Sequence, residues 1–163
     1  MIRQYKICSF LAAGVLLAVS ASAQARRARA DDADQKELYN YVLTMDKLQK
    51  LGDTTKALQN YAKQHPEAKD ESNGKTLDDM VQKMQKHPEA VAIINKNGLS
   101  PREYAVGLMT LMQAGMAVGF KKSGTYKEYP PDMLKLVSKQ NLDFVEQHWD
   151  AVEKMTKAHS DDQ

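Results

Sequence analysis

Cysteine is nearly absent from this 163-residue sequence, in which Cys8 is the only one. A disulfide within the chain needs two cysteines and c-type haem attachment needs a Cys-x-x-Cys-His motif, so both are excluded. The sequence also lacks a Gly-x-Ser-x-Gly elbow, a His-Glu-x-x-His pair, the Glu-x-x-His pair of di-iron bundles and a glycine-rich phosphate loop. These motifs mark common hydrolase, metal and nucleotide sites, so we expect a protein that is not an enzyme and holds no cofactor.

The first residues have the three-part layout of a secretory signal peptide. Two positive charges, Arg3 and Lys6, precede an apolar run at 7–19, and small residues follow it. We therefore predict that residues 1–23 are a signal peptide cleaved after Ala23. The mature protein is expected in the periplasm or secreted, and it would contain no cysteine.

Excess charge of either sign is missing from the predicted mature chain. The full sequence has 23 Lys and Arg against 21 Asp and Glu, and loss of the leader leaves 21 of each. Nucleic-acid-binding proteins usually carry a basic face or stripe, so we expect no nucleic-acid partner. The basic stretch at 26–30 is followed directly by acidic residues, which is typical of a solvated tail, so 24–33 is predicted to be a disordered linker.

Apolar residues recur at spacings of three and four through most of the chain, whereas strand-like alternation is missing. We therefore predict an all-α fold with one domain at 34–159, a helical bundle of about five to seven helices, and a solvated tail at 160–163. The first helix is expected at Asp34–Leu51, ended by Gly52, and the second is expected to run from Asp53 or Thr54 to His65.

The tripeptide His-Pro-Glu occurs twice, at 65–67 and 87–89, and has two explanations: a shared metal site or a pair of helix boundaries. Proline disfavours the helical conformation in the residue before it and suits the first turn of the next helix. Glutamate suits the positive end of a helix and histidine the negative end. A metal site would need three or four convergent ligands. We therefore predict that His65 and His87 mark helix boundaries, and we expect no metal.

Local signals also mark a loop, one helix end and two helix starts. The polar segment 67–75 is predicted to be a loop, after which Thr76 can cap a helix with Asp79 at the third helical position. Gly98 is placed to end a helix in the left-handed conformation. In the stretch Ser100–Glu103, serine can cap the next helix, proline can take its first position and glutamate can complete a capping box.

The most apolar stretch is 104–120, where Thr110 and Gln113 are the only polar side chains. A helix that is apolar all round is normally buried all round, so the helix near 101–122 is predicted to be central in the bundle and covered on every side. A bilayer span needs about 20 apolar residues, so we expect no membrane span in the mature chain. A Gly-x-x-x-Gly motif at Gly115 would let a neighbouring helix approach closely.

The C-terminal part is predicted to contain a connection and two helices. Two prolines keep 125–131 from being helical, a short helix is expected at 132–139, and Asn141 is expected to cap the last helix. The apolar residues predicted on the inward face of that last helix are Leu142, Val145, Trp149 and Val152.

Two stretches, GLSPREYAVGLMTLMQA at 98–114 and NLDFVEQHWDAVEKM at 141–155, resemble an uncharacterised family of small exported bacterial helical proteins. In that family a Gly-Leu-(Ser/Thr)-Pro-Arg-Glu-Tyr helix start is followed by a helix that opens with Asn and carries Phe-Val and His. The resemblance covers the C-terminal half of the chain. It implies an all-helical exported domain, and it carries over no activity and no site residue.

Four residues form the candidate binding surface. Tyr126 and Tyr129 lie on the predicted connection directly after the apolar helix, and His148 and Trp149 lie in the last helix. Tyrosine combines a flat apolar ring with a polar end, which makes it a good contact residue. We expect a non-enzymatic domain that binds a protein partner or a small apolar ligand there, unless the tyrosines simply cover the end of the bundle.

The alternative function is a periplasmic haem or copper carrier. Met45 and His148 are the residue types that bind haem from the first and last helices of four-helix b-type cytochromes, which the chain resembles only in these two positions. Copper could instead bind the thioethers of Met109, Met112 and Met116, because Cu(I) prefers soft sulfur ligands. Methionines on an apolar helix also pack in protein cores, so both a copper site and a packing role stay open for these three residues.

Overall fold

The computed structural model of the chain describes residues 32–65 and 76–160, with side chains as far as residue 155. These residues are all-α and contain no strand, and a compact unit begins at Asp34. The predicted signal peptide, the linker up to residue 31, the 67–75 loop and the last three residues of the tail lie outside them.

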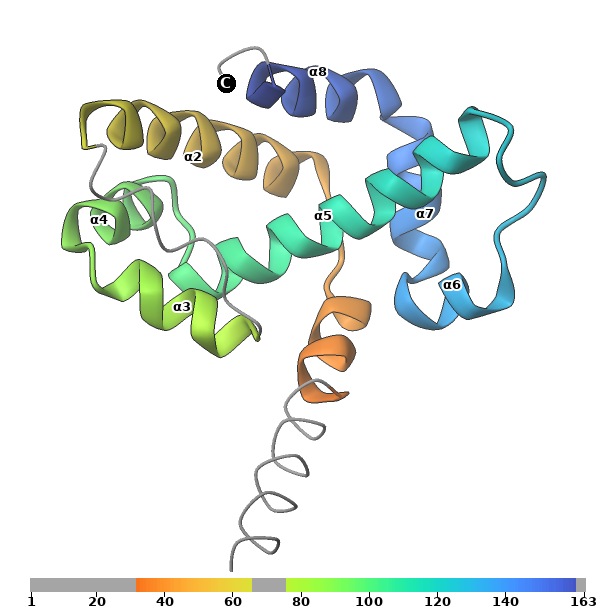
Figure 1. The fold of residues 1–163 in the computed structure, drawn as a ribbon, viewed down its shortest axis with the longest axis horizontal. Coiled ribbons are helices and arrows are strands. Elements are labelled where there is room, and N and C mark those ends of the chain that lie inside the picture. Colours follow the sequence, from red (N-terminus) through yellow and green to blue (C-terminus); the bar gives the residue numbers. More distant parts are fainter. Residues whose placement is uncertain (1–31, 66–75, 161–163) are drawn as a thin grey trace, which may run out of the picture. The chain divides into compact units, whose positions relative to one another are not determined.

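Eight helical segments make up the described residues (Figure 1). A segment at 32–40 is followed by α2 (Met45–Gln64), α3 (Leu77–Gln85), α4 (Pro88–Lys96), α5 (Pro101–Lys122), α6 (Pro131–Leu136), α7 (Lys139–Gln147) and α8 (Trp149–Ser160). Helix α5 is central, because α2, α3, α4 and α7 all pack against it. The prediction of an all-α bundle with a central helix near 101–122 is confirmed.

Two groups of buried apolar residues hold the bundle together. The larger lies around the middle of α5 and includes Leu51, Ile94, Leu111, Leu142 and Val145, all almost fully buried. The smaller joins the 32–40 segment to α3 and the start of α5 through Leu38, Leu77, Ala105 and Val106. The 32–40 segment is therefore part of the domain core from Asp34, where the compact unit begins, and residues 32 and 33 are also helical.

The predicted local signals for helix ends and starts are largely confirmed. His65 is the C-terminal cap of α2, and His87 directly precedes Pro88, the first residue of α4. Gly98 has a φ angle of 76°, the left-handed conformation that glycine adopts without strain. The Ser100 hydroxyl accepts a hydrogen bond from the Glu103 amide at 3.1 Å.

The first predicted helix, Asp34–Leu51, is wrong, because the chain is non-helical at 41–44 and helical again from Met45. The Thr44 side chain restarts the helix by accepting a hydrogen bond from the Lys47 amide at 3.3 Å. The backbone groups released by the break are bound by Asn141: the Leu43 amide donates to its Oδ1 at 2.9 Å, and its Nδ2 donates to the Tyr41 carbonyl at 2.7 Å.

Gly52 was expected to end the first helix but lies in the middle of α2. A Cβ atom at this position would be 3.4 Å from the Met155 sulfur. Gly52 therefore faces α8 within a continuous helix, and the chain does not turn there.

The last predicted helix is also two helices. The cap predicted at Asn141 belongs to Ser138, whose hydroxyl accepts a hydrogen bond from the Asn141 amide at 3.3 Å, and α6 ends earlier than expected because Val137 is extended. Helix α7 ends at His148, and α8 runs in a different direction (Figure 1). This change of direction keeps both Val145 and Val152 in the core.

The prediction that the central helix is buried on every side is wrong. Met112, Met116 and Phe120 are 50%, 56% and 46% exposed. They are spaced four residues apart, so they share one face of α5, and no described helix covers that face. Within the described part of the chain, no helix is both long enough and apolar enough to span a bilayer.

Candidate functional site

Tyr129 of the predicted surface is held firmly at the end of the bundle. Its ring packs against the main core, and its hydroxyl donates to Glu146 Oε1 at 2.5 Å. Lys121 also donates to Glu146 Oε1 at 2.5 Å and lies 4.6 Å from the centre of the Tyr129 ring. Burial, followed by the bond to Glu146, raises the pKa of the Tyr129 hydroxyl. These contacts favour a covering role for Tyr129.

Glu146 is the charged centre of this group. The hydrogen bond from Lys121, followed by that from Tyr129, lowers the pKa of the Glu146 carboxyl below its usual value. Glu146 therefore stays ionised and keeps both partners in place. Tyr126 does not join them, because its ring contacts Phe120 edge-on, with 5.9 Å between the ring centres.

His148 and Trp149 line a hollow of about 340 Å³ at the junction of α7 and α8. The centres of the His148 and Phe144 rings are 4.7 Å apart, and Lys122 Nζ lies 5.5 Å from the centre of the Trp149 ring. The structure thus brings two of the four predicted residues into one hollow, and Glu146 joins them there. Neither Tyr126 nor Tyr129 belongs to its lining.

A larger concave surface, which the sequence did not indicate, is the α2–α8 groove. It has a volume of about 580 Å³ and lies between two helices that run side by side (Figure 1). Its apolar lining consists of Met45, Leu48, Gly52, Ala151 and Met155. From Met45 to Asn60, the α2 wall is about 22 Å long, given the usual helical rise per residue.

The close approach of the two helices places the floor of the α2–α8 groove at Gly52. A larger residue at this position would meet Met155, which comes from the far end of the sequence. The spacing of Leu48 and Gly52 continues one stripe of α2, and this was the available sequence signal. This stripe is hard to recognise in the sequence, because a glycine at position 52 also predicts the end of a helix.

The residues predicted for haem or copper do not converge. Met45 lines the α2–α8 groove, whereas His148 lines the hollow at the α7–α8 junction. Met109 packs against the smaller core group, while Met112 and Met116 are exposed. Among the described residues, no three histidine, cysteine, aspartate or glutamate side chains gather in a way that could hold a metal ion.

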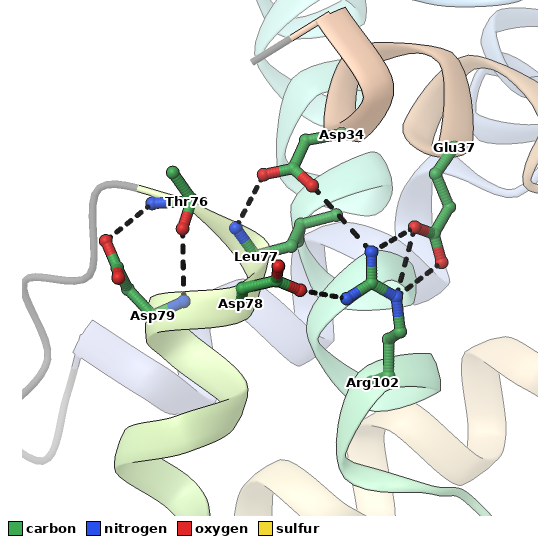
Figure 2. Close-up of polar contacts among 7 residues, drawn as sticks. All are labelled: Asp34, Glu37, Thr76, Leu77, Asp78, Asp79 and Arg102. Atoms are coloured by element: carbon green, nitrogen blue, oxygen red, sulfur yellow. Dashed lines mark hydrogen bonds and ion pairs between the residues drawn. The ribbon is translucent and has the colours of Figure 1, made fainter. Parts of the chain in front are cut away.

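The densest polar cluster of the described residues surrounds Arg102 (Figure 2). Its guanidinium donates two hydrogen bonds from Nε and one from Nη2 to the Glu37 carboxylate, the last at 2.6 Å, and another to Asp78 at 2.5 Å. Asp34 lies 3.8 Å away and accepts a hydrogen bond from the Leu77 amide at 2.8 Å. Arg102 thereby fastens the 32–40 segment and α3 to the start of α5.

The Arg102 cluster is not a binding site, because its charged groups are bonded to one another. Hydrogen bonds from Arg102 to Glu37, and then to Asp78, raise the pKa of the guanidinium above its ordinary value. The forked guanidinium matches the two oxygens of a carboxylate, a geometry that lysine could not reproduce. We assign this cluster to the architecture of the domain.

Comparison of the chain with protein-family models, with curated proteins and with solved structures finds no match to any of them. The resemblance to small exported helical proteins therefore stays a prediction. The concave surfaces of the domain, the α2–α8 groove and the hollow at the α7–α8 junction, are the remaining candidates for a binding site.

Proposed function

We propose that the protein is an exported, non-enzymatic helical domain that holds a small apolar ligand in the α2–α8 groove. The observation that carries this proposal is the groove itself, with its apolar floor at Leu48, Gly52 and Met155. Export is supported by the leader pattern at 1–23. The absence of hydrolase and phosphate-loop motifs supports a binding role.

The dimensions of the α2–α8 groove favour a small molecule over a protein partner. Ligand sites usually have volumes of about 300–1,000 Å³, a range that includes the volume of the groove. Its apolar residues form the floor, and polar residues of α2 and α8 surround them. Each of its two walls contributes a methionine: Met45 comes from α2 and Met155 from α8. Methionine is unbranched and flexible, so it can adapt to a ligand chain of variable shape.

Gly52 provides the test of this proposal. We expect Gly52→Leu to weaken binding of the neutral fluorescent probe N-phenyl-1-naphthylamine at least about tenfold, because the leucine side chain would fill the floor of the groove. Gly52→Ala is the matched control, since its Cβ would make an ordinary contact, 3.4 Å from the Met155 sulfur. The measurement is the dissociation constant from probe fluorescence, with thermal melting to confirm that each variant folds.

Equal affinity of the two Gly52 variants for the probe would contradict the proposal, as would a wild-type protein that does not bind it. If Gly52→Leu fails to fold, Met45→Gln serves instead, because Met45 is exposed at the end of the groove and its replacement leaves the core intact. This variant should weaken probe binding without lowering the melting temperature.

The copper carrier is kept as a second candidate for one specific observation. Met112 and Met116 are exposed on the same face of α5, one turn apart, where their thioethers can both reach a soft metal ion. Stoichiometric copper retained through purification from the periplasm, and lost in Met112→Leu with Met116→Leu, would favour this function over the apolar ligand.

A further inference from the structure

The polar rim of the α2–α8 groove contains one lysine from each wall. Lys56 comes from α2 and Lys154 from α8, and both line the groove. Both side chains are exposed, and neither forms an ion pair with any residue in the described part of the chain. Among the described residues of the lining, Asp53 is the only acidic one, so these residues together carry a net positive charge.

Apolar floor and cationic rim together define the chemistry of the ligand. We propose that the α2–α8 groove binds a free single-chain amphiphile with an anionic head, such as a fatty carboxylate, whose head contacts Lys56 and Lys154. This inference rests on the proposed function and names the ligand class for the same site. The ligand's hydrocarbon chain lies over Leu48, Gly52 and Met155 and is removed from water there.

The shape of the groove suits one hydrocarbon chain. Its walls are two single helices, and α2 rises by about 16 Å from Lys56 back to Met45, which accommodates an extended chain that passes over Leu48 and Gly52. Gly52 keeps the floor open, because a long side chain such as leucine there would extend into the groove beneath Met155, whereas a Cβ alone would make only an ordinary contact, 3.4 Å from the Met155 sulfur. A compact apolar ligand would leave much of this length unused.

Two ammonium groups at the rim favour an anionic head over a neutral one. A carboxylate accepts charge-assisted hydrogen bonds from lysine, which are shorter and stronger than bonds to a neutral hydroxyl. Lys56 and Lys154 have no carboxylate partner among the described residues, so binding such a head breaks no ion pair within that part of the chain. The lysines therefore distinguish amphiphiles by their heads, while the floor accepts their chains.

The experiment compares dodecanoate with dodecanol on the mature protein, each at a concentration at which it is monomeric. Dodecanoate should bind at least about tenfold more tightly than dodecanol. In Lys56→Gln with Lys154→Gln, dodecanoate affinity should fall by about the same factor while dodecanol affinity stays within about twofold. Lys96→Gln is the control, because Lys96 is equally exposed but lies in α4, away from the groove.

Each outcome separates this inference from the proposed function. If wild-type protein binds dodecanol and dodecanoate equally, the anionic-head inference is wrong while the apolar groove stands. If it binds neither, both are wrong. Binding to vesicles of anionic phospholipid without any binding of free dodecanoate would overturn the inference in favour of a membrane surface. Equal loss of both ligands in the double lysine variant would show that the lysines shape the groove instead of recognising the head.

Discussion

Asn141→Leu is expected to lower the free energy of unfolding by about 2–4 kcal/mol, because it leaves the buried Leu43 amide and the partly buried Tyr41 carbonyl without their partner. The Asn141 side chain is 0% exposed. Its Oδ1 accepts from the Leu43 amide at 2.9 Å, and its Nδ2 donates to the Tyr41 carbonyl at 2.7 Å. The leucine side chain has the same number of non-hydrogen atoms as asparagine, branched at the same carbon, so the substitution leaves no cavity and removes both hydrogen bonds.

Urea denaturation followed by circular dichroism measures the effect of Asn141→Leu. The matched control is Gln140→Leu, which places the same side chain on the exposed neighbour and should change stability by less than about 0.5 kcal/mol. If Asn141→Leu unfolds at the same urea concentration as the control, Asn141 does not hold the break between the 32–40 segment and α2.

Alanine at Gly107 and alanine at Gly115 are expected to have opposite effects on stability. At Gly107, a Cβ would lie 2.9 Å from the Tyr41 hydroxyl oxygen and 3.1 Å from a Leu51 methyl carbon. Leu51 is fully buried and cannot move away without disturbing the core. Gly107→Ala should therefore destabilise the domain by about 1–3 kcal/mol through overpacking.

Gly115→Ala should instead stabilise the domain by about 0.5–1 kcal/mol, because glycine in a helix interior is less favourable than alanine. Its Cβ would be 3.9 Å from the nearest atom, a Val152 methyl, which is an ordinary contact. The urea midpoints of the two variants give the comparison. Unchanged or increased stability in Gly107→Ala would show that this position is not tightly packed, and a loss of stability in Gly115→Ala would show that Gly115 lacks room for a methyl group.

Tyr41 explains why Gly107 is so constrained. Its hydroxyl oxygen is buried and has no hydrogen-bond partner among the described residues, and burial raises the pKa of this hydroxyl to about 12. Lys47 lies 4.0 Å from the centre of the ring, over its face. The ring is thus fixed between Lys47 and α5, and only a glycine leaves room for it.

The parts of the fold that were predicted correctly depend on neighbours in sequence. Ser100 caps α5 through Glu103, and Gly98 ends the preceding helix, because these interactions span only a few residues. Pro88 begins α4 for the same reason. Such signals can be recognised in one sequence, since the residue types that satisfy the first and last turns of a helix are few.

The parts that were predicted wrongly depend on residues far apart. The break at 41–44 is held by Asn141, about 100 positions away, so no local pattern reveals it. The role of Arg102 is similar, because its partners Glu37 and Asp78 belong to two other helices. The α2–α8 groove requires knowing which helices are neighbours, and helical periodicity alone does not provide that.

The most direct test of the α2–α8 groove as the ligand site is to follow the amide chemical shifts of the ¹⁵N-labelled protein during titration with dodecanoate. We expect the shifts to concentrate on the two walls of the groove, around Leu48 and Gly52 on α2 and Met155 on α8. Saturable shifts confined to these walls would support the account. Shifts that gather instead at Met112 on α5, or around Trp149 at the α7–α8 junction, would contradict it, and so would a spectrum that dodecanoate leaves unchanged.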